Sequence, residues 1–426
     1  MFRFQFTNSC KGARSSRAVL LMLSLLAAGA LAVPASAVTK KQQARTQAQP
    51  QPQVPAAAPE AEDPEVLLID VYKALGAHNL RKALARADKL VDAYPTFRLG
   101  HLIRGDLLLM QTQPVKTLGA VDGPEDKLKN LREEAMVRLK SLRERPDPDL
   151  VPRLVLKLRE DQKHVLVVDA RRSRLYVYAN RGGQLKFVTD YYVSQGKLGV
   201  NKLKEGDQRT PVGVYYITSH LPGAKLPDFY GSGALPINYP NEWDKINGRS
   251  GSGIWLHGTP SDSFSRPPLS SDGCVVLTNP DLHKLANSVE IGKTPVVIAE
   301  SVDFVNKTKW DNDRMLAARL VDGWKRDVET LNTARIGENY SRKFKSERGE
   351  SLESWLGKHQ QSMSGVRGLS VTLRDMTHFF YPGREDMIVS TFTQESQFGK
   401  NKTSIRKRQY WAKEGSHWKI IYELNL

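Results

Sequence analysis

The chain has 426 residues, and its 63 lysines and arginines exceed its 46 aspartates and glutamates, which gives a formal net charge of +17. A basic balance favours acidic surroundings, which include cell-wall polymers and membrane surfaces as well as nucleic acid. Because the charges are dispersed, and neither a nucleic-acid-binding signature nor an H-E-x-x-H pattern occurs, we expect no nucleic-acid partner, no metal and no cofactor.

The N-terminus has the order of a secretory signal peptide. Basic residues precede an apolar run over 18–33, and Ala35-Ser36-Ala37 follows it. The run is short for a membrane span and ends in an A-x-A pattern, so we expect removal of 1–37 and export to the periplasm, with an uncleaved anchor as the alternative. Cys10 would leave with this segment, and the mature chain would keep Cys274 as its only cysteine.

A linker and a helical domain are predicted next. Residues 38–62 are rich in Gln, Pro and Ala without apolar periodicity, which is typical of a disordered linker. Over 63–150 apolar residues recur at helical spacing, which predicts short antiparallel helices. No second copy of a tetratricopeptide-like hairpin follows, so we expect a helical cap or an element that pairs two chains. The charged stretch 118–148 belongs to this domain, and we expect its basic face to be solvated.

Two further domains follow, which makes the predicted fold class multidomain α+β. Residues 160–302 alternate apolar and polar positions and are rich in Val and Tyr, which predicts a mostly-β central domain. Residues 310–426 begin with helical periodicity and end with aromatic strands, which is typical of an α+β layer domain.

A lone cysteine in an oxidising compartment has no internal disulfide partner, so Cys274 is a free thiol, a buried bystander or an intermolecular link. A cysteine nucleophile needs a nearby base and a group that orients the base. His257 ends an apolar strand, and Gly258 directly after it could turn its carbonyl toward the imidazole ring. The other histidines of the β domain fit surface or packing roles better; they are at positions 164, 220 and 283.

The segment around Cys274 has the form of a tight turn into a strand. The 17 positions from His257 to Cys274 allow a loop that leaves one strand and returns to the next. Gly273 could adopt a conformation closed to other residues and aim the N–H groups of 273 and 274 at an oxyanion. Asp272 either forms the turn, which we favour, or pairs with an imidazolium or a substrate ammonium.

These motifs resemble the L,D-transpeptidase catalytic domain family. The match consists of His257-Gly258, followed by an S-x-G-C signature at Ser271 to Cys274. Upstream, Gly206-Asp207 with Thr210-Pro211 and Gly213 is similar to the family's G-D-x-x-T-P-x-G segment. The order of the motifs over 164–300 makes the resemblance specific.

The resemblance implies a β-sandwich-like domain that acts on peptidoglycan stem peptides. Cys274 would attack the bond after the third stem residue, and His257 would act as base and later as acid. The Gly258 carbonyl would orient the imidazole, while Ser271 and Gly273 would shape the catalytic turn. An amine from a second stem peptide, or possibly from a wall-linked protein, would resolve the acyl-enzyme in transpeptidation, whereas water would resolve it in carboxypeptidase or endopeptidase action.

Two features bear on that choice. Many members of the family carry arginine two residues after the cysteine, where this chain has Val276, and this resembles a subgroup in which some members are assigned hydrolysis. The C-terminal segment resembles the cone-shaped fold of nuclear transport factor 2, found behind the catalytic domain of L,D-carboxypeptidases that set helical cell shape. We predict transpeptidation, with hydrolysis as the alternative and a catalytically silent wall-binding scaffold as the alternative from another class.

Overall fold

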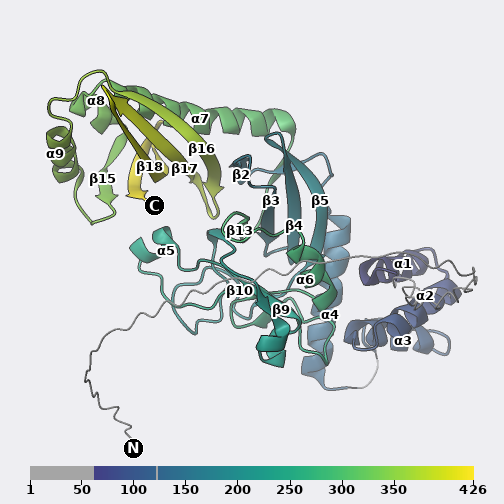
Figure 1. The fold of residues 1–426 in the computed structure, drawn as a ribbon. Helices are drawn as coiled ribbons and strands as arrows, with labels where there is room; N and C mark the ends of the chain where they lie inside the picture. Colours follow the sequence, from purple (N-terminus) through teal and green to yellow (C-terminus); the bar gives the residue numbers. More distant parts are fainter. Residues whose placement is uncertain (1–61, 121–122) are drawn as a thin grey trace, which may run out of the picture. The chain divides into compact units, whose positions relative to one another are not determined.

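The computed structural model describes residues 62–120 and 123–426 (Figure 1). The predicted signal peptide, Cys10 and nearly all of the predicted linker lie outside the described residues. The multidomain α+β class is confirmed, with helices first, a mostly-β centre and a C-terminal α+β domain. Among the described residues, no helix has the length and apolar character needed to cross a membrane.

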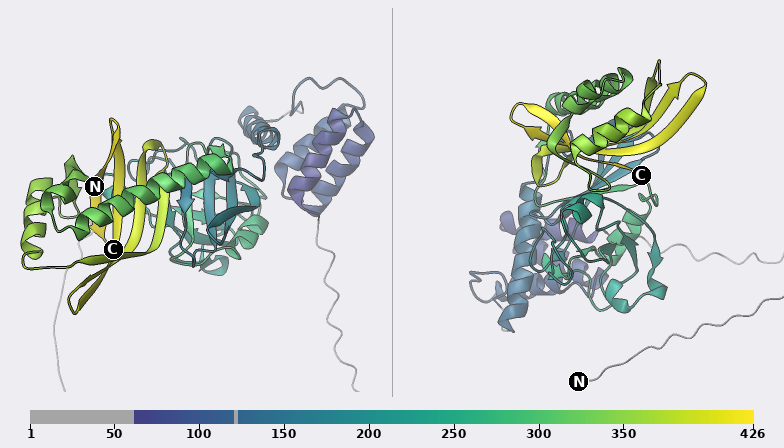
Figure 2. Two further views of the ribbon diagram at one scale, coloured as in Figure 1. Left: turned by 90° about the horizontal axis from the view of Figure 1, so that it is seen from above. Right: turned by 90° about the vertical axis from the view of Figure 1, so that its left-hand side faces the viewer.

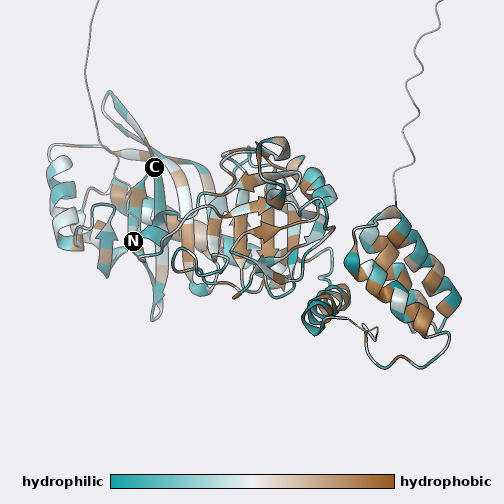
Figure 3. Cartoon of the chain, turned by 90° about the horizontal axis from the view of Figure 1, so that it is seen from below, coloured by the Kyte–Doolittle hydropathy of each residue, from teal (hydrophilic) through white to brown (hydrophobic). Residues whose placement is uncertain are grey.

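In its described residues the N-terminal part contains four helices: α1 (Pro64–Gly76), α2 (Leu80–Ala93), α3 (Arg98–Leu109) and α4 (Glu125–Arg143). Asp63 caps α1 by accepting the Glu65 N–H, and Pro64 occupies the first turn, where its missing N–H costs nothing. The first three helices carry hydrophobic stripes that face a shared core (Figure 3). That core includes one residue from the central domain, Phe264.

The prediction of a solvated basic face on α4 is wrong in one important respect. Glu134 and Arg138 of this helix are only 1% and 2% exposed. They form an ion pair at 2.8 Å, and Arg138 also pairs with Glu65. The guanidinium carbon of Arg138 lies 3.8 Å from the ring centre of Tyr192, so the charges are buried against the central domain. The two carboxylates, Glu134 and Glu65, pair with the Arg138 guanidinium, and this pairing offsets the cost of removing the charges from water.

The central domain is built on two sheets. The first has the order β5-β4-β3-β13-β7, from strands β3 (His164–Asp169), β4 (Arg174–Arg181), β5 (Gln184–Tyr192), β7 (Gly213–Tyr216) and β13 (Pro295–Ala299). The second has the order β12-β10-β9-β8, from β8 (Leu221–Pro222), β9 (Gly233–Pro236), β10 (Trp255–His257) and β12 (Val275–Val276). Leu166 and Val168 of β3 face a core shared with the second sheet, whereas Val165 and Val167 face a core shared with the C-terminal domain.

Short elements connect these sheets. They are β1 (Val151–Pro152), β6 (Gln195–Gly196), η1 (Gly223–Lys225), η2 (Asp228–Tyr230), α5 (Glu242–Ile246), β11 (Leu269–Ser271), α6 (Asn279–Ala286) and β14 (Phe304–Val305). Thr278 caps α6, the helix that follows the cysteine strand. This helix therefore begins directly beside the candidate site.

The C-terminal domain is a curved sheet covered by helices. Its helices are α7 (Lys307–Glu329), α8 (Thr333–Glu338) and α9 (Leu352–Ser362), and α7 lies along the sheet (Figure 2). Its own strands are β15 (Tyr340–Ser346), β16 (Ser370–Tyr381), β17 (Arg384–Phe398), β18 (Asn401–Glu414) and β19 (His417–Asn425). The sheet order β15-β19-β18-β17-β16-β2 ends on β2 (Val155–Lys157), a strand that precedes the central domain in sequence.

Candidate active site

Parallel pairing of two short strands brings the two sequence motifs together. Strand β10 pairs with β12 so that Leu256 lies opposite Val275 and His257 opposite Val276. The His257 carbonyl accepts the Leu277 N–H at 2.9 Å, which fixes this register. Cys274 directly precedes β12, so the loop between the motifs returns the cysteine to the strand beside His257.

The imidazole of His257 is buried and held in one tautomer. Its Nδ1 lies 2.7 Å from the Gly258 carbonyl, and because a carbonyl only accepts, Nδ1 carries the hydrogen. Among the described residues Nε2 has no hydrogen-bond partner, so its lone pair is available as a base. Burial lowers the pKa of His257 to about 4, against the opposing effect of the Gly258 carbonyl. The ring is therefore neutral near pH 7.

Close packing around Gly258 explains why a glycine follows the histidine. A Cβ at this position would collide with Oδ1 of Asn279. That oxygen accepts the Ser232 N–H at 2.9 Å, while Nδ2 of Asn279 donates to the Thr259 carbonyl at 2.8 Å. The side chain thus ties the backbone after β10 to its neighbours, and a larger residue at 258 would displace it.

The thiol of Cys274 is protonated in this environment. Burial raises its pKa above the ordinary value, although the Trp255 N–H and the Arg266 guanidinium favour the thiolate. The sulfur lies 3.4 Å from the Gly253 carbonyl, to which the thiol donates. The described residues contain no hydrogen bond between this thiol and His257, and such bonds often form only when substrate is bound.

The turn before Cys274 is held by its own polar groups. Ser271 Oγ donates to the Cys274 carbonyl at 2.6 Å and accepts the Gly273 N–H at 3.1 Å. Gly273 has φ +128°, and a Cβ there would lie 2.7 Å from the Arg209 carbonyl. Ser271 therefore occupies the Gly273 N–H, one of the two N–H groups that the sequence analysis expects to face an oxyanion.

Asp272 lies at the surface of the same turn. Its carboxylate accepts from Lys197 Nζ at 2.9 Å and from Gln208 Nε2 at 3.2 Å. The hydrogen bond to Lys197 lowers the pKa of Asp272. In this structure the Asp272 carboxylate thus has Lys197 and Gln208 as its partners, and its pairing with an imidazolium or a substrate ammonium stays a prediction.

Two aromatic residues that the sequence analysis did not single out border His257, the candidate base. Phe229 and Tyr230 of η2 have ring centres 5.8 Å and 5.1 Å from that of His257. Arg266, on the loop between the two motifs, lies over the Phe229 ring at 4.4 Å. Because Arg266 lies between the histidine and cysteine motifs in sequence, its position near His257 could have been predicted. The sequence of η2 gives no indication that its aromatic residues lie beside His257.

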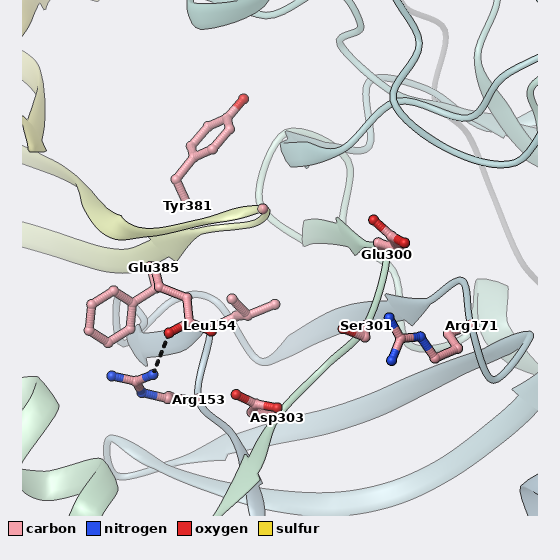
Figure 4. Close-up of a pocket in the computed structure, with 10 residues that line it drawn as sticks. Arg153, Leu154, Arg171, Glu300, Ser301, Asp303, Tyr381 and Glu385 are labelled. Carbon is pink, nitrogen blue, oxygen red and sulfur yellow. Dashed lines mark ion pairs between the residues drawn. The ribbon is translucent and has the colours of Figure 1, made fainter.

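A separate hollow of about 240 Å³ lies between the central and C-terminal domains (Figure 4). Arg153, Glu385, Arg171 and Glu300 are among its lining residues, and Arg153 pairs with Glu385 at 3.7 Å. Neither Cys274 nor His257 lines it. The candidate catalytic residues therefore lie outside this hollow.

Comparison with known families gives two matches along the chain. Residues 163–298 match the L,D-transpeptidase catalytic domain, and residues 316–424 match the Cds6 C-terminal NTF2-like domain. No curated protein matches the chain.

Two solved structures resemble the chain over about two thirds of its length. The structure of Bd1075 from Bdellovibrio bacteriovorus has 30% sequence identity and a TM-score of 0.58, over 65% of this chain and 98% of that chain. The helical cell shape determining protein Pgp2 from Campylobacter jejuni has 24% identity and a TM-score of 0.55, over 66% of this chain and 97% of that chain. The second likeness is one of fold.

Proposed function

The chain belongs to the L,D-transpeptidase catalytic domain family, and from that premise we propose that it modifies peptidoglycan through a thioester at Cys274. The observation that carries the proposal is the state of His257. Its Nδ1 is committed to the Gly258 carbonyl and its Nε2 is neutral and unpartnered among the described residues. This is the form of imidazole that can take a thiol proton.

Acylation would proceed in two steps. The Cys274 sulfur attacks the carbonyl carbon of the bond after the third stem residue while His257 Nε2 takes the thiol proton, and the Cys274 N–H faces the developing oxyanion. The imidazolium then protonates the departing amine as the C–N bond breaks. The products are a D-amino acid and a thioester between the stem peptide and Cys274. The low pKa of His257 favours this proton donation.

The nucleophile that accepts the acyl group determines whether the reaction is transpeptidation or hydrolysis. Transfer to an amine of a second stem peptide gives a crosslink, which is the outcome predicted from the sequence. Hydrolysis is the second candidate, and the observation in its favour is Val276, which is buried in β12 where many family members carry arginine. The same neutral His257 can activate either nucleophile.

Product analysis by mass spectrometry tests both candidates. The full chain is incubated with stem tetrapeptides, with and without an added amine acceptor, beside the Cys274→Ala variant. Cys274-dependent dimers would establish transpeptidation, whereas tripeptide with released D-alanine and no dimer would establish hydrolysis. Full retention of turnover in Cys274→Ala would refute the thioester.

We also propose an exported protein with a role in cell shape. Support comes from the predicted signal peptide and from the fold likeness to a protein described as determining helical cell shape. The test is complementation of a deletion strain with wild-type and Cys274→Ala genes. Rescue of shape by Cys274→Ala would favour the scaffold alternative over an enzyme.

A further inference from the structure

Arg266 is a half-buried cation beside the catalytic histidine. It lies on the loop between β10 and β11, and its Nη2 donates to the Phe229 carbonyl at 3.3 Å. Its guanidinium stacks on the Phe229 ring, and that ring contacts His257. Among the described residues Arg266 forms no ion pair, so a charge at the edge of the site lacks a counter-ion.

The charge of Arg266 acts on both catalytic groups. It favours the thiolate of Cys274 and disfavours protonation of His257. The nearest acidic residue of the catalytic turn, Asp272, is already paired with Lys197. The Arg266 guanidinium is thus partly removed from water, held on an aromatic face and without an acidic partner among the described residues. These properties suit it to bind a carboxylate.

Three contacts hold the backbone of this arginine in place. The Arg266 carbonyl accepts the Tyr192 hydroxyl at 2.9 Å. The preceding Ser265 donates to the buried carboxylate of Glu134 on α4 at 2.7 Å. Before it, Phe264 lies in the helical core, with ring centres 5.1 Å from Tyr94 and 4.7 Å from Phe97. The N-terminal helices thus anchor the loop that presents Arg266.

We propose that Arg266 binds a carboxylate of the stem peptide and that the N-terminal helices position it for this purpose. This inference rests on the proposed function, since it names the substrate group that the same site recognises. The carboxylate belongs either to the terminal D-residue or to the side chain of the third residue. In either case Arg266 is a specificity-determining residue, and the helical domain completes the active site.

Binding to the full-length Cys274→Ala protein tests the proposal independently of turnover. The probes are a tetrapeptide with a free terminal carboxylate, its terminal amide, and a tetrapeptide with lysine in place of diaminopimelate at the third position. We expect Arg266→Gln to weaken binding of the free-acid, diaminopimelate-containing tetrapeptide by tenfold or more, on the order of a lost charge-assisted hydrogen-bond pair. Arg266→Lys should recover part of the affinity, and Arg374→Gln, at an exposed pair in the C-terminal domain, should change nothing.

The probe that becomes insensitive to Arg266→Gln identifies the carboxylate that the arginine binds. Equal weakening of all three probes, or no weakening of any, overturns the inference. Turnover by the protein with Cys274 intact is measured separately with the free-acid tetrapeptide. If no probe is turned over but binding of the free acid still depends on Arg266, the proposed function fails while the inference stands.

A separate variant, Ser265→Ala, tests whether the N-terminal helices position Arg266. Ser265→Ala removes the hydrogen bond to Glu134 and leaves the guanidinium unchanged. We expect it to raise KM for the free-acid tetrapeptide by severalfold, with kcat and the KM of the insensitive probe unchanged. A fall in kcat alone, or an unchanged KM, would overturn the positioning role.

Discussion

Two glycines of the candidate site, Gly258 and Gly273, lie where an added Cβ would collide with neighbouring atoms. We expect Gly258→Ala to lower kcat strongly and to destabilise the fold by about 1–3 kcal/mol, because the new methyl group collides with Asn279 and shifts the carbonyl that orients His257. Steady-state kinetics and urea unfolding measure the two effects. The control is Gly357→Ala in α9, where nothing lies within 4 Å of a Cβ; this variant should keep full activity. Equal behaviour of both variants would contradict the packing argument.

The protonation of Cys274 and His257 without substrate gives a second prediction. Because burial raises the pKa of Cys274 and lowers that of His257 to about 4, the free protein holds a neutral thiol and a neutral imidazole near pH 7. The rate of iodoacetamide alkylation of Cys274 should therefore still be rising with pH at pH 9. A plateau below pH 7 would instead indicate a preformed thiolate–imidazolium pair.

At the scale of elements, α4 carries a buried charge pair that joins the helical and catalytic parts. Glu134→Ala leaves Arg138 buried with Glu65 alone, and we expect a loss of about 3–5 kcal/mol in the free energy of unfolding. Glu144→Ala, which removes the exposed partner of Lys140 at 3.9 Å, should change it by about 0.5 kcal/mol or less. Urea unfolding of both variants checks the difference. A small effect of Glu134→Ala would mean that water reaches Arg138.

At the scale of the whole molecule, buried neutral histidines make stability depend on pH. Burial lowers the pKa of His378 to about 3 and that of His257 to about 4, both below the ordinary value of 6.5. As the pH falls, the two histidines are therefore protonated in the unfolded chain before they are protonated in the folded chain. Their contribution to the free energy of unfolding is full above about pH 6.5 and is lost toward pH 4. Asp281, whose pKa burial raises to about 6, opposes this trend in part.

The variant His378→Gln isolates one of these contributions. We expect its free energy of unfolding to fall less than that of the wild type between pH 7 and pH 4, by about 3 kcal/mol. Urea titrations at the two pH values measure it, and His283→Gln, on the surface helix α6, should keep the wild-type dependence. Parallel pH curves for wild type and His378→Gln would show that His378 protonates normally in the folded state.

The multidomain α+β class, the family and the segments of the candidate site could be predicted from near neighbours in the sequence. This was possible because His257-Gly258 and the Ser271 to Cys274 turn are local patterns whose spacing also predicts adjacent strand ends. The roles of these residues remain predictions until they are tested. The strand periodicity of 160–302 and the helix-then-strand order of 310–426 were likewise visible because each depends on near neighbours in sequence.

The distant residues that contact these segments are seen in the folded molecule and could not be predicted. Glu134 and Ser265 are 131 residues apart, yet their hydrogen bond anchors the loop of Arg266. Strand β2 completes a sheet whose other strands begin at Tyr340. The burial of the α4 charges follows from packing between segments that carry no mutual signal in sequence. The position of Arg266 between the two motifs indicated that it lies near the site, but its contact with Phe229 and the anchoring of its loop by Glu134 had no such signal. Burial sets the cost of each charge, and burial is a property of the assembled fold.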